Sequence, residues 1–294
     1  MTELSVKQTS SWQSYYEMCK PRVVMLMILT SVAGMFLAVP GMVPLDILIL
    51  GNIGIALVCA SGAVVNHLID RRIDSLMKRT HNRPLPQGAI EPIQAGIFAA
   101  AIGVIGMFIL LRWVNPLCAW LALASFVGYA FIYTGYLKRA TPQNIVIGGL
   151  SGAMPPLLGW TAVSGTIDSN ALILVLIIFA WTPPHFWALA IHRKDEYAKT
   201  GIPMLPVTHG EHVTKIHIII YTILLVVVSV FPYMTGMSGI LYLVSALALG
   251  LGFLWWSAVL MFKPKATTAM ETFRYSIVYL IALYVALIAD HYLF

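Results

Sequence analysis

Three oxygen-bearing side chains recur at every fourth position in one polar stretch: Asn66, Asp70 and Asp74. On an α-helix, residues i, i+4 and i+8 fall within an arc of about 80°, so these side chains would share one stripe. Amide and carboxylate oxygens suit a hard cation such as Mg²⁺, which commonly links one or two carboxylates to a substrate phosphate. The stripe therefore predicts a catalytic metal-diphosphate site. The alternative is a solvated helix end whose acids pair with the neighbouring arginines and lysines.

A second polar cluster follows Pro183-Pro184, where we expect a helix to begin or kink. His185, His192 and Glu196 are spaced i, i+7 and i+11, which places them within about 40° if the helix persists, and Asp195 lies on the flank. By helical rise, His185 would lie about 16 Å deeper than Glu196. Polar groups at such depth normally face an interior cavity. We expect this cluster and the first stripe to meet in one site.

Basic residues accompany both clusters. Lysine and arginine side chains beside Mg²⁺ hold a diphosphate and neutralise its charge as it leaves. The candidates for this role are Lys20, Arg22, Arg83, Lys138 and Arg139, and we expect the last two to act in catalysis as well. The alternative for each is that it only satisfies the charge asymmetry of a membrane protein.

Aromatic residues precede and follow the polar clusters, and they could line an apolar pocket that stabilises an allylic carbocation. They are Tyr129, Tyr133, Trp160, Trp181, Phe186 and Trp187. The alternative for each is ordinary packing or an interfacial belt.

The elements that must position these residues are membrane-spanning helices. The chain has 294 residues, of which 59% are hydrophobic and 10% charged, whereas soluble domains carry about 25% charged residues. Apolar stretches long enough to cross a hydrocarbon core of about 30 Å recur along it, and in lipid such stretches must be helical. We predict an all-α polytopic protein, a single domain over 1–294, with nine spans: 22–39, 46–69, 94–111, 116–136, 143–162, 169–191, 213–234, 238–262 and 272–292.

The charge distribution predicts the orientation. All but one of the 18 Lys and Arg residues fall in the N-terminal segment and the loops on its side, and the exception is Arg112. By the positive-inside rule the N-terminus, with a tail over 1–19, is cytoplasmic and the C-terminus is external. The net charge of +6 is therefore a topology signal, and we expect no nucleic-acid partner.

The motifs together resemble those of the UbiA-type intramembrane prenyltransferases. The resemblance rests on the Asn66, Asp70 and Asp74 spacing, on 82–86 (Asn-Arg-Pro-Leu-Pro) and on the acidic loop after the sixth span. Further similarity lies in 20–22, 133–139 and 151–156. The Pro-His pair at 184–185 and the run Ile-Pro-Met-Leu-Pro-Val at 202–207 are most similar to the branch that farnesylates haem, the haem O synthases.

The resemblance implies nine helices around a central cavity, with Mg²⁺ and diphosphate at a mouth facing the cytoplasm. It implies transfer of a farnesyl group from farnesyl diphosphate to a vinyl group of haem B, giving haem O, in a bacterial inner membrane. Haem A synthase or terminal oxidase assembly would act downstream.

The resemblance also assigns roles to individual residues. Asn66, Asp70 and Asp74 match the first metal motif, and Asp195 and Glu196 sit at the end of a second one. His185 and His192 stand where relatives that prenylate aromatic acids carry aspartates, which leaves a second metal site open. Imidazoles suit an iron porphyrin, so we expect haem contacts from His185, His192 and Trp187, with His185 as an axial or near-axial contact to the iron.

Three alternatives stay open at this point. A UbiA-type enzyme could prenylate an aromatic acid or a quinone precursor, although the histidines of the second motif argue against this. A transporter would place polar residues near the midplane on broken helices, whereas here the acids gather at one face. An inactive scaffold for oxidase assembly would not need the metal-ligand residues, which are intact.

Overall fold

The computed structural model describes residues 11–293, and every regular element in that range is helical. In chain order the elements are α1 (Ser11–Met18), α2 (Pro21–Leu37), α3 (Leu45–Asp74), α4 (Pro92–Ile109), η1 (Leu110–Val114), α5 (Pro116–Val127), η2 (Gly128–Leu137), α6 (Lys138–Ala140), α7 (Asn144–Gly152), α8 (Pro155–Ser164), α9 (Ser169–His192), α10 (Lys194–Thr200), α11 (Leu205–Thr208), α12 (Gly210–Val228), α13 (Phe231–Met234), α14 (Ile240–Phe262) and α15 (Thr268–Leu293). The elements η1 and η2 are π-helical.

Local sequence explains where several of these helices begin and end. Proline lacks a backbone N–H, and it fits the first turn of a helix, where that group has no helical partner. The helices that begin in this way include α2, α4, α5 and α8. The Asn115 side chain accepts a hydrogen bond from Cys118 N and so caps α5. Gly165, in the left-handed region at φ 69°, ends α8.

The predicted spans are confirmed. Within the described residues, eight helical segments are long and apolar enough to cross a membrane, and the bent pair α1–α2 makes a ninth if it counts as one span. The bend between these two helices is 51°. Of the expected tail over 1–19, residues 1–10 lie outside the described residues, and Ser11–Met18 form α1.

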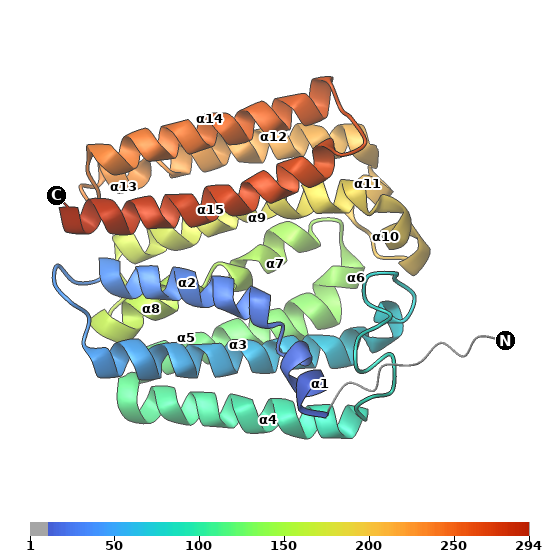
Figure 1. Ribbon diagram of the computed structural model, residues 1–294, viewed down its shortest axis with the longest axis horizontal. Helices are drawn as coiled ribbons and strands as arrows, with labels where there is room; N and C mark the ends of the chain where they lie inside the picture. The colour runs from blue at the N-terminus through green and yellow to red at the C-terminus, as the bar shows by residue number, and fades with distance from the viewer. Residues whose placement is uncertain (1–10, 294) are drawn as a thin grey trace.

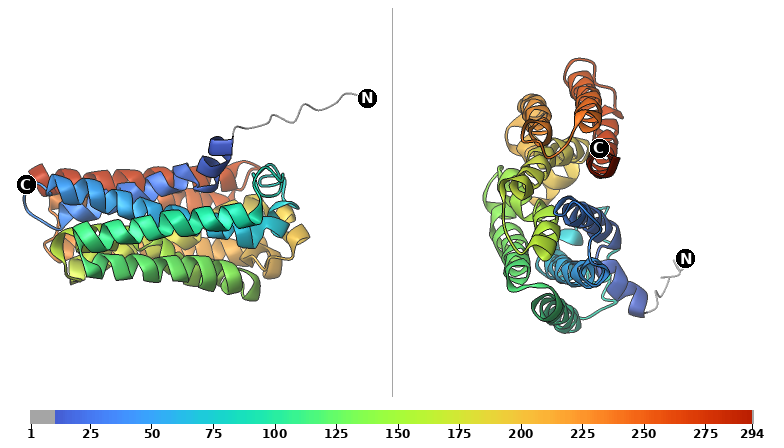
Figure 2. Two further views of the ribbon diagram at one scale, coloured as in Figure 1. Left: turned by 90° about the horizontal axis from the view of Figure 1, so that it is seen from below. Right: turned by 90° about the vertical axis from the view of Figure 1, so that its left-hand side faces the viewer.

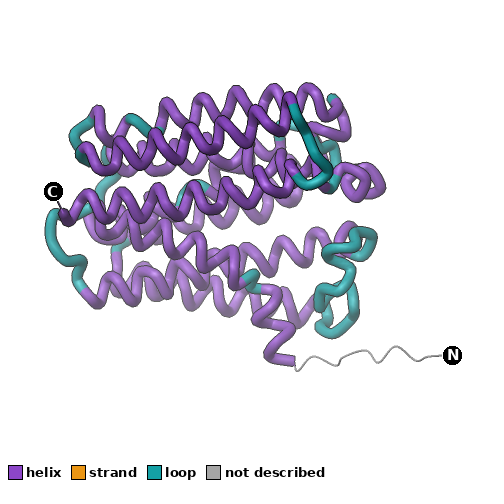
Figure 3. Tube along the Cα trace, turned by 45° about the horizontal axis from the view of Figure 1, so that its top comes forward, coloured by secondary structure: helices purple, strands orange, loops and turns teal. Residues whose placement is uncertain are grey.

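The long helices run nearly parallel to one axis, and α15 finishes at the left-hand end of the bundle in this view (Figure 1). Seen along that axis, they form a curved wall of helices (Figure 2). The loops gather at the two ends (Figure 3). One end carries the 75–91 loop, α6, α10 and α11, and α1 lies on the side of the bundle in the half towards that end.

Small residues allow two of the helices to pack closely. A Cβ on Gly159 of α8 would lie 1.9 Å from the carbonyl oxygen of Ser31 on α2, and one on Gly34 would lie 2.1 Å from that of Pro156. Such close approach is typical of membrane helices, where small residues let two backbones meet. The contact fixes α2, and with it the polar turn that precedes α2.

One expectation about the second cluster is wrong. Helix α9 continues through Pro183 and Pro184 but ends at His192, because Arg193 leaves helical geometry at φ −112° and ψ 23°. Residues Lys194–Thr200 then form the separate helix α10. The stripe predicted from His185 to Glu196 therefore does not exist as one continuous helical face.

Candidate active site

The first stripe is a buried polar face on the last turns of α3. Asn66, Asp70 and Asp74 are 5%, 1% and 4% exposed. Because this helix end carries its polar residues inward, burial of the acids must be compensated by partners. The partners come from four other parts of the chain.

The side-chain amide of Asn66 bridges Lys20 and the Asp70 carboxylate, which Lys138 also contacts. The Lys20 ammonium donates to Asn66 Oδ1, and Asn66 Nδ2 donates to Asp70 Oδ2 at 2.8 Å. Lys138 Nζ, on α6, lies 2.6 Å from the same carboxylate oxygen. Lys20 lies 46 residues from Asn66 along the chain and Lys138 lies 68 residues from Asp70, so two distant segments are tied to one stripe.

The third member is held by the loop that follows it. Arg83 pairs with Asp74 Oδ2 at 2.6 Å, and Thr80 Oγ1 donates to the Asp74 carbonyl oxygen at 2.9 Å. Arg139 completes the surroundings, 3.9 Å from Asp70 Oδ1 and donating to the Ile69 carbonyl oxygen at 3.2 Å. Of the five predicted diphosphate ligands, four therefore surround the stripe.

The fifth predicted diphosphate ligand lies apart. Arg22 is exposed, and its guanidinium has no hydrogen bond or ion pair with the residues that the structure describes. Lys20, two residues earlier, adopts φ 49° and is the one non-glycine residue in that range with a positive φ. This left-handed conformation is unfavourable for a residue with a Cβ. It turns the chain between α1 and α2, and the Lys20 side chain reaches Asn66.

The π-helix η2 supplies one contact that the sequence did not predict, from Thr134, and carries two of the predicted aromatic residues, Tyr129 and Tyr133. Thr134 accepts a hydrogen bond from Asn66 Nδ2 at 3.1 Å and donates to the Tyr129 carbonyl oxygen at 2.9 Å, five residues back. Tyr129 stacks on Tyr133 with ring centroids 5.9 Å apart, and its hydroxyl lies 3.5 Å from Lys20 Nζ. A π-helix at a functional site is common, but no residue pattern marked this one.

The other predicted aromatic residues do not form one pocket. Trp160 donates to Asp168 at 2.9 Å, at the opposite end of the bundle. Phe186 is 41% exposed. Trp181 donates to the Ser276 carbonyl oxygen at 2.7 Å, and Trp187 is fully buried. Of the six predicted aromatic residues, Tyr129 contacts Lys20 and Thr134 beside the acidic stripe, and Tyr133 stacks on Tyr129.

The donor set on α3 fits a magnesium ion shared with a substrate phosphate. Asp70 Oδ1 is buried without a hydrogen bond, with Arg139 no closer than 3.9 Å, and such a carboxylate oxygen is costly to bury unless a cation binds it directly. Two carboxylates and an amide suffice, because Mg²⁺ in such sites takes most of its ligands from water and substrate. Across the described residues, no three His, Cys, Asp or Glu side chains gather into a metal cage.

Among the described residues, no hydrogen bond or ion pair connects the predicted second set of metal ligands to the first. Asp195 is exposed, and Glu196 Oε1 pairs with Arg193 at 3.3 Å. The break in the helix at Arg193 turns these acids onto a separate short helix. Its buried residue, Tyr197, has the pKa of its phenol raised by burial, so it stays protonated.

His185, the predicted haem contact, lies in an aromatic sandwich between α9 and α15. Its ring stacks on Trp181 at 4.2 Å and on Phe273 at 4.5 Å, and its Nδ1 lies 2.6 Å from Ser276 Oγ. Ser276 donates its one hydroxyl proton to the Phe273 carbonyl oxygen at 2.6 Å. His185 Nδ1 must then donate to Ser276, which leaves a lone pair on Nε2.

The other two predicted haem contacts differ from each other. His192 is exposed at the end of α9. Trp187 is buried, its Nε1 has no hydrogen-bond partner, and its ring meets those of His217 and Tyr221 edge-on. The sequence also gave no signal for His67, which is buried beside Asn66 with both ring nitrogens unpartnered.

Acids at the opposite end of the bundle have a different role. Asp168 accepts hydrogen bonds from the backbone N–H groups of Asn170 and Ala171, and so caps α9. Asp290 is buried and accepts from Gly239 N and Tyr242 N at the start of α14. These contacts bind helix ends and do not continue the α3 site into a relay across the bundle.

Comparison of the sequence with known proteins points to one family. Residues 27–284 match the UbiA prenyltransferase family. The chain is 60% identical over 296 residues to a protoheme IX farnesyltransferase of Saccharophagus degradans, covering 100% of this chain and 98% of that protein. It is 61% identical over 292 residues to protoheme IX farnesyltransferase 1 of Pseudomonas putida, covering 99% and 98%.

Solved structures share the fold. A structure of digeranylgeranylglyceryl phosphate synthase superposes with a TM-score of 0.81 at 21% identity, over 97% of this chain and 99% of that one. A UbiA homolog from Archaeoglobus fulgidus, bound to DMAPP and Mg²⁺, gives a TM-score of 0.69 at 16% identity, over 94% and 99%.

Proposed function

The chain belongs to the UbiA prenyltransferase family, and from this premise we propose that it transfers a farnesyl group from farnesyl diphosphate to a vinyl group of haem B, giving haem O. The substrate pair is supported by relatives about 60% identical over almost their whole length that are named protoheme IX farnesyltransferase. The observation that carries the proposal is the buried α3 stripe. Each of its two carboxylates and its amide contacts a cationic side chain, and each of these cations could instead bind a diphosphate.

The residues of the stripe and its partners have separate roles. Lys20, Arg83 and Lys138 exchange their contacts with α3 for the diphosphate oxygens and so neutralise the leaving group. Asp70 and Asp74 would hold Mg²⁺ together with Asn66, and the ion, when bound, supplies positive charge to the diphosphate as the carbon–oxygen bond breaks. Arg139 lies beside Asp70 and holds the end of α3 through the Ile69 carbonyl oxygen.

The reaction balances with these groups. The allylic carbon–oxygen bond breaks, and its electron pair leaves with diphosphate. The terminal carbon of the haem vinyl group attacks the allylic cation, which moves the positive charge to the carbon next to the porphyrin ring. Water adds there and loses a proton, leaving a hydroxyethylfarnesyl group. The stacked rings of Tyr129 and Tyr133 lie beside the stripe, where a cation forms.

We assign the haem iron to His185. The hydrogen bond from its Nδ1 to Ser276 fixes the neutral tautomer with a free Nε2 lone pair, which is how proteins prepare a histidine for a metal. The two stacked rings cover both faces of the imidazole and Phe186 packs perpendicular to it at 5.0 Å, so an incoming ligand would reach only the remaining ring edge. His185→Ala should change the visible spectrum of bound haem, and Ser276→Ala should shift it less. A spectrum unchanged in His185→Ala would sink the assignment.

The proposal includes a place in the cell. The site loops share one end of the bundle with the N-terminal side of the chain, and most basic residues lie there. By the positive-inside rule that end faces the cytoplasm of a bacterial inner membrane. Haem O released there would pass to haem A synthase or to terminal oxidase assembly.

The direct test is incubation of the protein in membranes with haem B, farnesyl diphosphate and Mg²⁺, followed by mass spectrometry. We expect the mass of haem O, and we expect chelation of the divalent cation to stop its formation. Turnover unaffected by chelation would contradict the Mg²⁺ role. A parallel reaction with hydroxybenzoate tests the other substrate class: prenylated hydroxybenzoate without haem O would overturn the proposal.

A further inference from the structure

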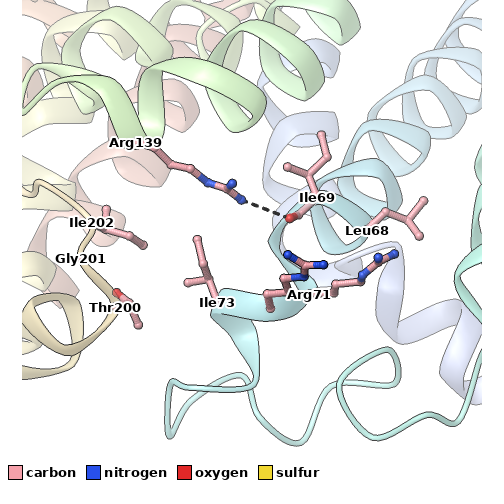
Figure 4. Close-up of a pocket in the computed structure, with 9 residues that line it drawn as sticks. Leu68, Ile69, Arg71, Ile73, Arg139, Thr200, Gly201 and Ile202 are labelled. Carbon is pink, nitrogen blue, oxygen red and sulfur yellow. Dashed lines mark hydrogen bonds between the residues drawn. The ribbon is translucent and has the colours of Figure 1, made fainter.

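A pocket of about 550 Å³ lies beside the acidic stripe, between the end of α3 and the turn after α10. It is lined by Leu68, Ile69, Arg71, Arg72, Ile73, Arg139, Thr200, Gly201 and Ile202. Figure 4 shows Arg139 reaching across to the Ile69 carbonyl oxygen, with Thr200, Gly201 and Ile202 on the facing side. Its volume is in the usual range for small-molecule sites, about 300–1,000 Å³.

Three guanidinium groups line this pocket, and most of their donors are free. Arg71 and Arg72 are exposed, and their side chains have no hydrogen bond or ion pair with the described part of the chain. Arg139, with a side chain 49% exposed, donates one hydrogen bond to Ile69. Each guanidinium carries five N–H donors. The pocket therefore suits a ligand with more than one anionic group.

Membrane topology explains why arginines occur at this helix end, but it does not explain the pocket that they line. Arginines at the cytoplasmic end of a span and at a helix C-terminus are favourable in any membrane protein. That explanation does not require them to border a pocket with aliphatic side chains on its other surfaces. Leu68, Ile69 and Ile73 supply most of this aliphatic surface, because Ile202 is almost fully buried. The lining is polar over most of its exposed area, and it fits the acidic edge of an amphipathic ligand whose apolar part lies against the aliphatic residues.

We propose, resting on the proposed function, that this pocket holds the two propionate carboxylates of haem B, with the edge of the macrocycle against the aliphatic residues. Arginine pairs with carboxylates through two parallel hydrogen bonds. The other cations at this site, Lys20, Arg83 and Lys138, are committed to the α3 stripe. Arg139 borders both regions, because it lines the pocket and lies 3.9 Å from Asp70.

The experiment compares haem B with its dimethyl ester, which keeps the macrocycle and loses both charges. Purified protein in detergent is titrated with each compound by visible absorption, without farnesyl diphosphate. The variants are Arg71→Gln, Arg72→Gln and the double variant. Lys263→Gln removes an exposed charge from the loop between α14 and α15, outside the pocket, and serves as the matched control.

We expect the wild type and Lys263→Gln to bind the acid more tightly than the ester. The double variant should lose about tenfold in affinity for the acid, as expected for lost charged hydrogen bonds, and little for the ester. Unchanged binding of farnesyl diphosphate shows that the variant is folded. Equal losses for acid and ester, or an acid preference that survives in the double variant, would overturn the proposal.

Two further measurements separate failure of the proposed function from failure of the proposed carboxylate site. If the wild type prefers the acid and the double variant does not, yet no haem O forms with farnesyl diphosphate, the proposed function fails and the carboxylate site stands. If haem O forms but the acid preference is independent of Arg71 and Arg72, only the carboxylate site fails. Phosphatidylglycerol that abolishes the preference in the wild type would assign the pocket to a lipid phosphate instead.

Discussion

The aspartates at the two ends of the bundle are held by different kinds of partner. At one end, Asp168 and Asp290 accept hydrogen bonds from backbone N–H groups at helix starts. At the other, Asp70 and Asp74 are paired with Lys138 and Arg83. A backbone donor is fixed by its helix, whereas a long side chain can leave its partner for another anion. Burial of an acid therefore signals function only when its partners are exchangeable.

The largest effect is expected at the end of the bundle where lysine and arginine side chains hold the aspartates. Asp70→Asn keeps the size of the side chain but removes its charge, so it should lower haem O formation by roughly 10²–10³-fold, the usual cost of losing one well-placed charge-stabilising group. The rate is measured by mass spectrometry in membranes with equal amounts of protein. Full activity in Asp70→Asn would refute the metal-site assignment, and equal melting temperatures in detergent would exclude misfolding.

The second largest effect is expected at the end of the bundle where backbone N–H groups hold the aspartates. It should lower stability and leave activity unchanged. Asp290→Ala leaves the buried N–H group of Tyr242 and the half-buried N–H group of Gly239 without an acceptor, which costs about 1–3 kcal/mol. We expect a lower melting temperature in detergent and an unchanged rate per folded molecule. A rate reduced as strongly as in Asp70→Asn would break the distinction between the two ends.

A smaller loss is expected for the exposed cap at the start of α9. Asp168→Ala removes the acceptor for Asn170 N and Ala171 N and the partner of the Trp160 indole, and loss of a helix cap costs about 1 kcal/mol. Asp168→Asn keeps a capping oxygen and serves as the control. Thermal unfolding of both variants checks this; equal destabilisation would assign the effect to charge and not to capping.

The smallest effect is expected in α10. Glu196 pairs only with Arg193, both side chains are partly exposed, and such pairs contribute about 0–1 kcal/mol. Glu196→Gln should therefore change both stability and haem O formation little. A loss of activity approaching that of Asp70→Asn would show that this acid moves into the metal site when substrate binds, and would restore the second motif.

The sequence predicted what depends on local pattern. Apolar length gave the spans, and the i, i+4, i+8 spacing gave the α3 stripe. It could not predict that Arg193 would end α9, because the residues on both sides favour a helix. Nor could it pair His185 with Ser276, 91 residues away, or Lys20 with Asn66. Those contacts depend on tertiary packing, which a single sequence does not reveal.

The number of residues in the π-helix η2 determines the direction in which the side chains that follow it point. Each residue added to or removed from an α-helix rotates the next side chains by about 100°. Lys138 comes directly after η2, so its meeting with Asp70 depends on the extra residues that the wider turns accommodate. Deleting one residue within Gly128–Leu137 would keep the span apolar and of membrane-crossing length. It would turn the lysine away from its carboxylate, so the length of this segment is itself a site determinant.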